Sequence, residues 1–232
     1  MITVRRSEDR GVAEHGWLSS RHTFSFADYY DEKHMGFSVL RVINEDRILG
    51  GSGFRTHPHR DMEIISYVID GSLEHKDSMG NSTIIQPGEV QRMSAGTGIQ
   101  HSEMNHERDK VTHFLQIWIL PERTGIQPSY DQKSFQNSFA RNELILVASK
   151  NGRDGSVSLH QDVEMFALKA PTQGDTIFST STHRHLWLQV ISGIVSVDET
   201  QLRGGDGAGI TQTQSFKLKW SDRAELILFD LP

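Results

Sequence analysis

The sequence predicts an all-β fold in which two similar barrels follow one another along the chain. Short segments rich in β-branched and aromatic residues recur, and clusters of Gly, Asn, Asp and Pro separate them. A spacing of roughly 8–12 residues between such segments is typical of β-sandwiches and β-barrels. No segment keeps the apolar period of an amphipathic helix over several turns. Strands therefore make up nearly all of the predicted regular structure.

The strongest strand patterns lie between clear turn signals. Asp70-Gly71, Gly80-Asn81 and Pro87-Gly88 mark turns in the first half, and Gly204-Gly205-Asp206-Gly207 marks one in the second. We expect strands at residues 37–43, 62–69, 111–120, 144–148, 163–168, 186–191, 194–197 and 225–231.

A polar stretch that begins at Pro121 predicts a connection between two halves of the chain. The halves resemble each other, because residues 66–73 (SYVIDGSL) and 188–195 (LQVISGIV) each combine a strand, a glycine turn and a return strand. The turn at Pro87-Gly88-Glu89 and the turn at Gly204-Gly205-Asp206 follow in the same order. We expect an N-terminal domain at 1–121, a connecting segment at 122–142 and a C-terminal domain at 143–232.

Composition excludes several classes of function. The chain has 24 basic and 30 acidic residues, a net charge of −6, and its longest basic run is Arg5-Arg6. A broad basic face for nucleic acid is therefore not expected. There is no cysteine, which excludes disulfides, thiolate nucleophiles and iron–sulfur clusters. No apolar run approaches the length of a membrane span and no signal peptide is evident, so we expect a cytoplasmic protein.

Two pairs of metal-ligating residues share the same spacing. His57 and His59 stand at positions i and i+2, and so do His101 and Glu103. On a strand, this spacing directs both side chains to one face. Alone, the first pair is better explained as two ordinary histidines near a turn, and the second is equally well explained as a surface loop with a solvated charge. Together, within an all-β pattern and beside glycine-rich turns, they predict one metal ion bound by three imidazoles and a carboxylate.

These two fragments resemble the motifs of the cupin superfamily. The first motif, Gly-x5-His-x-His-x3–4-Glu-x6-Gly, is matched by Gly51, His57 and His59, with Gly71 at its end. The end of the second motif, Gly-x2-His-x3-Asn, is matched at residues 98, 101 and 105. The carboxylate is ambiguous. Counting forward from the histidines gives Glu63, but counting back from Gly71 gives residue 64, so Glu103 is the preferred ligand and Glu63 the alternative.

Within the cupins the chain is similar to the pirin family. The resemblance implies a bicupin whose N-terminal barrel binds the metal through His57, His59, His101 and Glu103, and whose C-terminal barrel is metal-free. It covers most of the first half of the chain and is looser after about residue 121. It rests on residues 15–17 (HGW), 23–31 (TFSFADYYD), 35–37 (MGF), 40–46 (LRVINED), 53–63 (GFRTHPHRDME) and 94–103 (SAGTGIQHSE).

The other histidines are expected to bind no metal. His183 and His185 form a second His-x-His, but aligning Gly193 with Gly71 places them opposite residues 61 and 63, and no histidine follows them. The same ordinary role is expected of His15, His22, His34, His75, His106, His113 and His160, with His75 the least certain because its hairpin would lie near the pocket mouth.

Three neutral imidazoles and one carboxylate leave open positions on a six-coordinate divalent ion. Such a ligand set suits several divalent transition metals. The resemblance favours Fe(II), with Zn, Cu, Ni, Mn or Co as alternatives. An open site of this kind can bring a chelating substrate together with O2, and Glu103 could serve both as ligand and as base. Phe54 and Met93 are near enough in sequence to form walls of a pocket.

The pirin resemblance implies cleavage of a flavonol such as quercetin by O2 with release of carbon monoxide. The partners would then be a small aromatic substrate and O2, with no direct nucleic-acid or membrane contact, and the chain would act as a monomer. The resemblance also implies an alternative: a non-catalytic, metal- and redox-sensing protein that binds a transcription factor or a metabolic enzyme.

Overall fold

The computed structural model describes residues 1–232, and the chain forms two compact units. The N-terminal unit contains residues 11–134 and 157–161, and the C-terminal unit contains residues 1–10, 135–156 and 162–232. The all-β prediction is confirmed, because the α-helical structure is limited to the four-residue helix α1 (Gln136–Phe139). None of the helices has the length and apolar character needed to cross a membrane.

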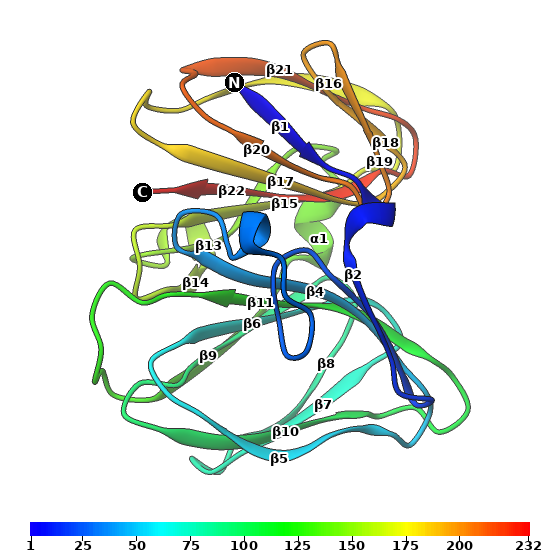
Figure 1. The fold of residues 1–232 in the computed structure, drawn as a ribbon, viewed down its shortest axis with the longest axis vertical. Helices are drawn as coiled ribbons and strands as arrows, with labels where there is room; N and C mark the ends of the chain where they lie inside the picture. Colours follow the sequence, from blue (N-terminus) through cyan, green and yellow to red (C-terminus); the bar gives the residue numbers. More distant parts are fainter. The chain divides into compact units, whose positions relative to one another are not determined.

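In the N-terminal unit a seven-stranded sheet and a four-stranded sheet form the two layers (Figure 1). The larger sheet has the order β12 (Ser129–Ser134), β9 (Glu89–Ser94), β6 (Glu63–Asp70), β11 (Thr112–Ile119), β4 (Leu40–Ile48), β3 (Leu18–His22) and β2 (Gly11–Glu14). The smaller sheet has the order β5 (Gly53–His59), β10 (Ile99–Asn105), β7 (Leu73–Asp77) and β8 (Ser82–Ile85). A 3-10 helix, η2 (Glu32–His34), precedes β4.

The C-terminal unit repeats this arrangement. Its larger sheet contains, in order, β1 (Ile2–Arg5), β20 (Gly207–Ile210), β17 (His185–Ser192), β22 (Glu225–Leu231), β15 (Glu164–Lys169) and β13 (Ile145–Ser149). Its smaller sheet has the order β16 (Gly174–Ser179), β21 (Ser215–Trp220), β18 (Ile194–Val197) and β19 (Thr200–Arg203). Two 3-10 helices, η1 (Ser7–Asp9) and η3 (Arg153–Gly155), also belong to this unit, whereas β14 (Val157–Ser158) belongs to the N-terminal one.

Each unit is thus a jelly-roll-like sandwich of two sheets, which confirms the expected pair of tandem, similar domains. The hydrogen-bonded ladder of each unit is divided between a larger and a smaller sheet and does not continue around the unit. The expected duplication is visible in the strand orders. The run β9-β6-β11-β4 corresponds to β20-β17-β22-β15, and β5-β10-β7-β8 corresponds to β16-β21-β18-β19.

All the segments expected as strands contain strands, with small differences at the ends. The largest is at β4, which begins at Leu40 and continues to Ile48 because it pairs with β11 along its whole length. Residues 122–142, expected to connect the halves, contain β12, which pairs with β9, and α1. Residues 1–10 lie with the C-terminal unit because β1 pairs with β20.

The hairpins that resemble each other in sequence also match in backbone geometry. Gly71, between β6 and β7, and Gly193, between β17 and β18, both have φ of +80°. This left-handed conformation favours glycine. A side chain at Gly71 would also meet the Thr112 hydroxyl at 2.6 Å, and one at Gly193 would meet Ala224 at 2.7 Å. The turn therefore requires glycine in both units.

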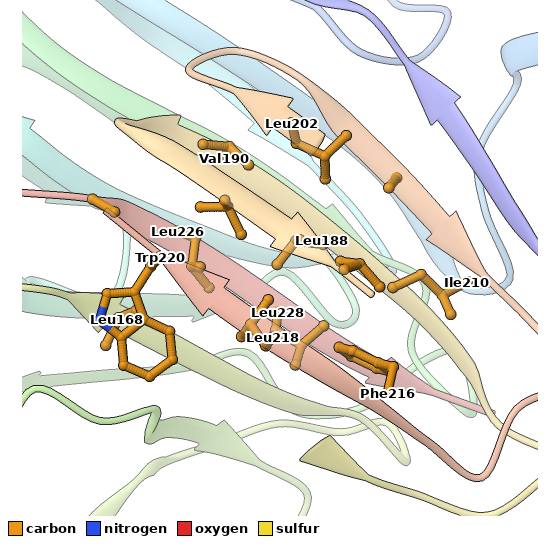
Figure 2. Close-up of a cluster of buried hydrophobic side chains, with 14 of the residues drawn as sticks. Leu168, Leu188, Val190, Leu202, Ile210, Phe216, Leu218, Trp220, Leu226 and Leu228 are labelled. Carbon is orange, nitrogen blue, oxygen red and sulfur yellow. The ribbon is translucent and has the colours of Figure 1, made fainter. Parts of the chain in front are cut away.

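The interior of the C-terminal unit is one continuous apolar core (Figure 2). The alternating pattern of strand β21 shows how this core forms. Its residues Phe216, Leu218 and Trp220 face inward, and the residues between them, Ser215, Lys217 and Lys219, are exposed. Leu188 and Leu228, which pair across β17 and β22, belong to the same cluster. Period-two alternation thus places an apolar face of each sheet inside the sandwich.

The interior of the N-terminal unit is divided instead. One apolar cluster contains Val68 and Phe114, a cross-strand pair of β6 and β11. A second cluster contains Ile64, and Trp118 packs against it. Ile64 and Trp118 form the cross-strand pair that lies four residues along the same two strands from Val68 and Phe114. Between these two pairs lies the pair of Ser66 and Gln116, both buried and polar. A polar row therefore crosses the middle of this sheet where the other unit has leucine.

Asn105, at the end of β10, offers a test of how this unit is held together. Its Nδ2 donates to the carbonyls of Ile48 (2.9 Å) and Lys110 (2.7 Å), and its Oδ1 accepts from the backbone N–H of Glu107 (2.8 Å). We expect Asn105→Ala to lower the free energy of unfolding by about 2–4 kcal/mol, because the buried Asn105 side chain joins three backbone groups by hydrogen bonds that alanine cannot make. Urea unfolding followed by tryptophan fluorescence measures this.

Gln100→Ala is the matched control, because Gln100 lies on the same strand and its side chain is exposed. The control should change the free energy of unfolding by less than about 0.5 kcal/mol. Equal effects of the two substitutions would contradict the structural role given to Asn105.

Candidate metal centre

Three histidines converge inside the N-terminal unit from two neighbouring strands. His57 and His59 lie on β5, and His101 lies on β10 directly opposite His57 in the antiparallel pairing. One ring nitrogen of each histidine lies within 4.8 Å of those of the other two. The Nε2 atoms of His57 and His101 are 3.1 Å apart. The i, i+2 spacing on β5 thus directs both side chains to the face of the sheet from which His101 of the neighbouring β10 also projects.

The hydrogen bonds leave ligand atoms available. The Nδ1 of His57 lies 2.7 Å from the carbonyl oxygen of Arg55, which can only accept, so this nitrogen carries the proton and Nε2 holds a lone pair. The Nε2 of His59 is buried without a hydrogen-bond partner in the chain. A buried polar atom without a partner is costly unless an external group satisfies it. The imidazoles therefore fit a bound cation.

Burial keeps two of these imidazoles neutral. Desolvation, reinforced by the neighbouring histidines, lowers the pKa of His59 to about 4 and that of His101 to about 3. Both rings are then uncharged at neutral pH, which is the form that binds a metal.

Glu103 is the next inward-facing residue on β10 after His101. Its Oε2 lies 4.0 Å from the Nε2 of His101, and its side chain is 2% exposed. The hydroxyl of Ser66 donates to Oε1 and the Nε2 of Gln116 donates to Oε2, both at 2.9 Å. These bonds compensate for the burial of a carboxylate and fix its orientation beside the histidines.

The supporting residues Ser66 and Gln116 escape sequence reasoning. Each is a polar residue within an otherwise apolar strand segment, in β6 and β11 respectively. A polar side chain in the middle of a buried strand signals a required partner, but the sequence does not name that partner. The partner, Glu103, lies on the opposite sheet.

Glu63 faces away from the histidines. Ser66 points inward to Glu103, and side chains alternate along β6, so Glu63 projects from the other face of its sheet. There its Oε2 accepts from the backbone N–H of His160 at 3.1 Å, and its negative charge acts on the buried Arg92. The structure thus places the alternative carboxylate with His160.

The remaining histidines range from fully buried to exposed. His75 on β7 is fully buried, its ring centre is 5.3 Å from that of His101, and its Nε2 lies 3.1 Å from Asp77. It borders the histidine cluster and has no ordinary surface role. In the C-terminal unit His183 is exposed, and the Nδ1 of His185 lies 3.1 Å from the carbonyl of Pro232.

A cavity opens beside His57 and Glu103. Phe26, Phe54 and Trp118 supply its aromatic wall. Phe26 and Trp118 pack edge to face at 5.3 Å, and Trp118 contacts His59 at 4.9 Å between ring centres. Phe54 is thus a wall, as expected, whereas Met93 packs in the apolar core beside Ile64. A flat aromatic ligand could lie against these rings next to the candidate ligands.

Family models match both halves of the chain. Residues 3–119 match the model described as Pirin, and residues 146–231 match the one described as quercetinase C-terminal cupin domain. A protein named quercetin 2,3-dioxygenase from Escherichia coli strain K12 is 46% identical over 232 residues, covering 100% of this chain and 99% of that protein.

Solved structures agree with the fold. The bacterial pirin YhhW from Escherichia coli, in complex with nickel(II), has a TM-score of 0.95 and 46% identity, covering 100% of this chain and 99% of that one. A quercetin 2,3-dioxygenase from Acinetobacter baumannii has a TM-score of 0.73 at 18% identity, covering 99% of this chain and 78% of that one. The second likeness concerns the fold alone.

Substitution of Glu63 tests which carboxylate belongs to the centre. Because Glu63 faces away from the histidines, we expect Glu63→Gln to bind one divalent ion per chain with unchanged affinity, as isothermal titration calorimetry would measure. The same variant should lose about 1–3 kcal/mol of stability, because Arg92 loses a buried countercharge. Loss of metal binding with the fold intact would contradict this orientation of Glu63.

Proposed function

The chain belongs to the pirin family, and we propose that it is a metal-dependent dioxygenase that cleaves a flavonol such as quercetin with O2 and releases carbon monoxide. One observation carries the proposal: three histidines converge beside a buried carboxylate at the wall of an aromatic-lined cavity. A relative that is 46% identical over its whole length bears the name of this activity.

The proposed metal ligands are His57, His59, His101 and Glu103. The three ring nitrogens within 4.8 Å of one another, the unpartnered Nε2 of His59 and the position of Glu103 next to His101 support this set. Four protein ligands would leave open positions on a six-coordinate ion. We propose Fe(II) as the ion, because open imidazole–carboxylate sites of non-haem oxygenases hold ferrous iron.

Glu103 is the proposed catalytic base. A chelating flavonol must lose the proton of its 3-hydroxyl, and the carboxylate of Glu103 is a buried acceptor that lines the cavity next to the histidines. The bonds from Ser66 and Gln116 fix the orientation of this carboxylate while leaving each oxygen a further lone pair. Glu103 therefore can hold the substrate proton without moving.

The aromatic wall orients the substrate and excludes water. Phe26, Phe54 and Trp118 present ring faces and edges against which the flat flavonol rings pack. The metal, when bound, supplies a Lewis acid that polarises the chelating oxygens and brings them next to O2. In the reaction both atoms of O2 enter the cleaved ring system, and one ring carbon leaves as carbon monoxide.

We further propose that the protein acts in the cytoplasm as a monomer whose partners are the small aromatic substrate and O2. The lack of cysteine suits a reducing compartment, and the net charge of −6 disfavours direct contact with nucleic acid.

Removal of one imidazole tests the ligand set. We expect His101→Ala to weaken divalent-metal binding by at least about 100-fold. Loss of a residue that only hydrogen-bonds to a metal ligand already costs about 10–100-fold in metal affinity, and loss of the ligand itself costs more. Competition with a chromophoric chelator measures the affinity, and elemental analysis of protein purified without added metal identifies the ion. The double variant His183→Ala/His185→Ala removes the other His-x-His and should leave the affinity unchanged. Equal losses in the two variants would refute the assignment.

The catalytic role of Glu103 is tested with the iron-loaded protein. We expect Glu103→Gln to reduce kcat for quercetin by about 10²–10⁴-fold, because the proton acceptor is lost. Oxygen consumption and carbon monoxide release measure turnover, and metal content is determined alongside. Glu63→Gln is the matched control, since it removes a buried carboxylate of the same unit from outside the cavity.

Absence of flavonol turnover by the iron-loaded wild-type protein would contradict the proposed function. Metal-dependent capture of a protein partner under the same conditions would then favour the non-catalytic alternative.

A further inference from the structure

The cavity extends from the metal centre to a polar wall that the metal does not need. This wall consists of Ser20 on β3 and of Asn44 and Asp46 on β4. All three are buried, with exposed fractions of 1%, 3% and 3%. The hydrogen bonds that orient Glu103 come from other residues, namely Ser66 and Gln116. The polar wall therefore requires an explanation of its own.

Asn44 and Asp46 each have a side-chain oxygen that is fully shielded from solvent and has no hydrogen-bond partner in the chain. Burial raises the pKa of Asp46 to about 7, although a hydrogen bond from the Ser20 hydroxyl acts in the opposite direction. Burying a polar atom without a hydrogen bond costs about 1–3 kcal/mol, and burying a carboxylate costs more. Selection for folding alone would remove such residues, so they point to a ligand that pairs with them.

The wall is continuous with the metal centre. Across the larger sheet, Ser20 lies opposite Asp46, and Asn44 lies opposite Gln116. Gln116 in turn donates to Glu103. A molecule that reaches Glu103 in this cavity can therefore also reach Asn44 and Asp46.

The C-terminal unit shows that the fold itself does not require polar residues here. With Gly193 aligned on Gly71, Leu188 and Leu228 pair as Ser66 and Gln116 do. On the next strand, Phe166 pairs with Leu228 in the way that Asn44 pairs with Gln116. Two residues further on, Leu168 pairs with Leu226 in the way that Asp46 pairs with Phe114. The positions equivalent to Asn44 and Asp46 are thus Phe166 and Leu168, which pack against or within the apolar core.

The chemistry of the wall defines the ligand class. Asp46 and Asn44 offer oxygens that accept hydrogen bonds, and the Ser20 hydroxyl can accept or donate. The opposite side of the cavity is aromatic, with Phe26, Phe54 and Trp118. A flat ring that carries hydroxyl groups satisfies both sides, whereas a carboxylated or phosphorylated ring would bring a further negative charge next to Glu103 and Asp46.

We propose that Asp46 and Asn44, together with Ser20, form a hydroxyl-binding subsite that selects substrates with phenolic hydroxyls away from the chelating group. This inference rests on the proposed function for the identity of the substrate. It adds that the polar wall of the cavity determines which flavonols bind tightly, and that chelation at the metal centre alone does not select among them.

Binding to the metal-free protein tests the subsite independently of catalysis. The two probes are quercetin and 3-hydroxyflavone, which keeps the chelating hydroxyl and ketone but lacks the other hydroxyls. We expect the wild-type protein to bind quercetin about 10- to 100-fold more tightly, because 3-hydroxyflavone lacks the hydroxyls that pair with the buried Asp46 and Asn44. Isothermal titration calorimetry measures both dissociation constants.

Asp46→Leu copies the residue at the equivalent position of the C-terminal unit. We expect it to reduce the preference for quercetin by about 10-fold or more, with Asp46→Asn intermediate. Because a buried, incompletely paired carboxylate is removed, the unfolding midpoint of Asp46→Leu should not fall. Asp70→Asn, at an exposed position of β6, is the control and should retain the wild-type preference.

An unchanged preference in Asp46→Leu, or no preference in the wild-type protein, would overturn the proposal and leave the wall as a water-filled space. A lowered unfolding midpoint with unchanged preference would also overturn it, by making Asp46 a structural residue. A shifted preference without any turnover by the iron-loaded protein would support the subsite and refute the proposed function. Turnover of quercetin together with an unchanged preference in Asp46→Leu would support the proposed function and overturn the subsite.

Discussion

The N-terminal unit is organised around one buried carboxylate. Glu103 lies inside the sandwich, and a buried carboxylate is tolerated only with hydrogen-bonding partners. Ser66 and Gln116 on the facing sheet supply them. This requirement explains why the apolar interior of the unit is split into two clusters, with a polar row between the pair Val68–Phe114 and the pair Ile64–Trp118.

The duplicated fold allows the two units to serve different purposes. In the C-terminal unit the same strand positions carry Leu188 and Leu228, and a single core runs through the sandwich. That unit gains the full benefit of apolar burial. The N-terminal unit gives up part of this benefit for a polar interior, where His57, Glu103 and the wall formed by Asn44 and Asp46 line one cavity. Such a trade between stability and activity is common at functional sites.

The candidate ligands were predictable because their spacing is local. His57 and His59, like His101 and Glu103, are two residues apart, and strand geometry alone directs each pair to one face. The choice between Glu103 and Glu63 was harder, because counting along the motif gave no unique answer. In the structure Ser66 points inward to Glu103, so alternation along β6 turns Glu63 outward to His160. Ile64 and Val68, which share this inward face with Ser66, lie in the two apolar clusters and agree with that orientation.

The sequence by itself determined the all-β class, the duplicated hairpins and the identity of the candidate ligands, since strand period, turn glycines and ligand spacing are all properties of short segments. Only the tertiary structure decided that each unit is a two-sheet sandwich, that Ser66 and Gln116 hold Glu103, and that Asn44 and Asp46 reach the same cavity. These features join residues on opposite sheets or distant strands. Their proximity follows from the register and packing of the assembled unit, which no local pattern specifies.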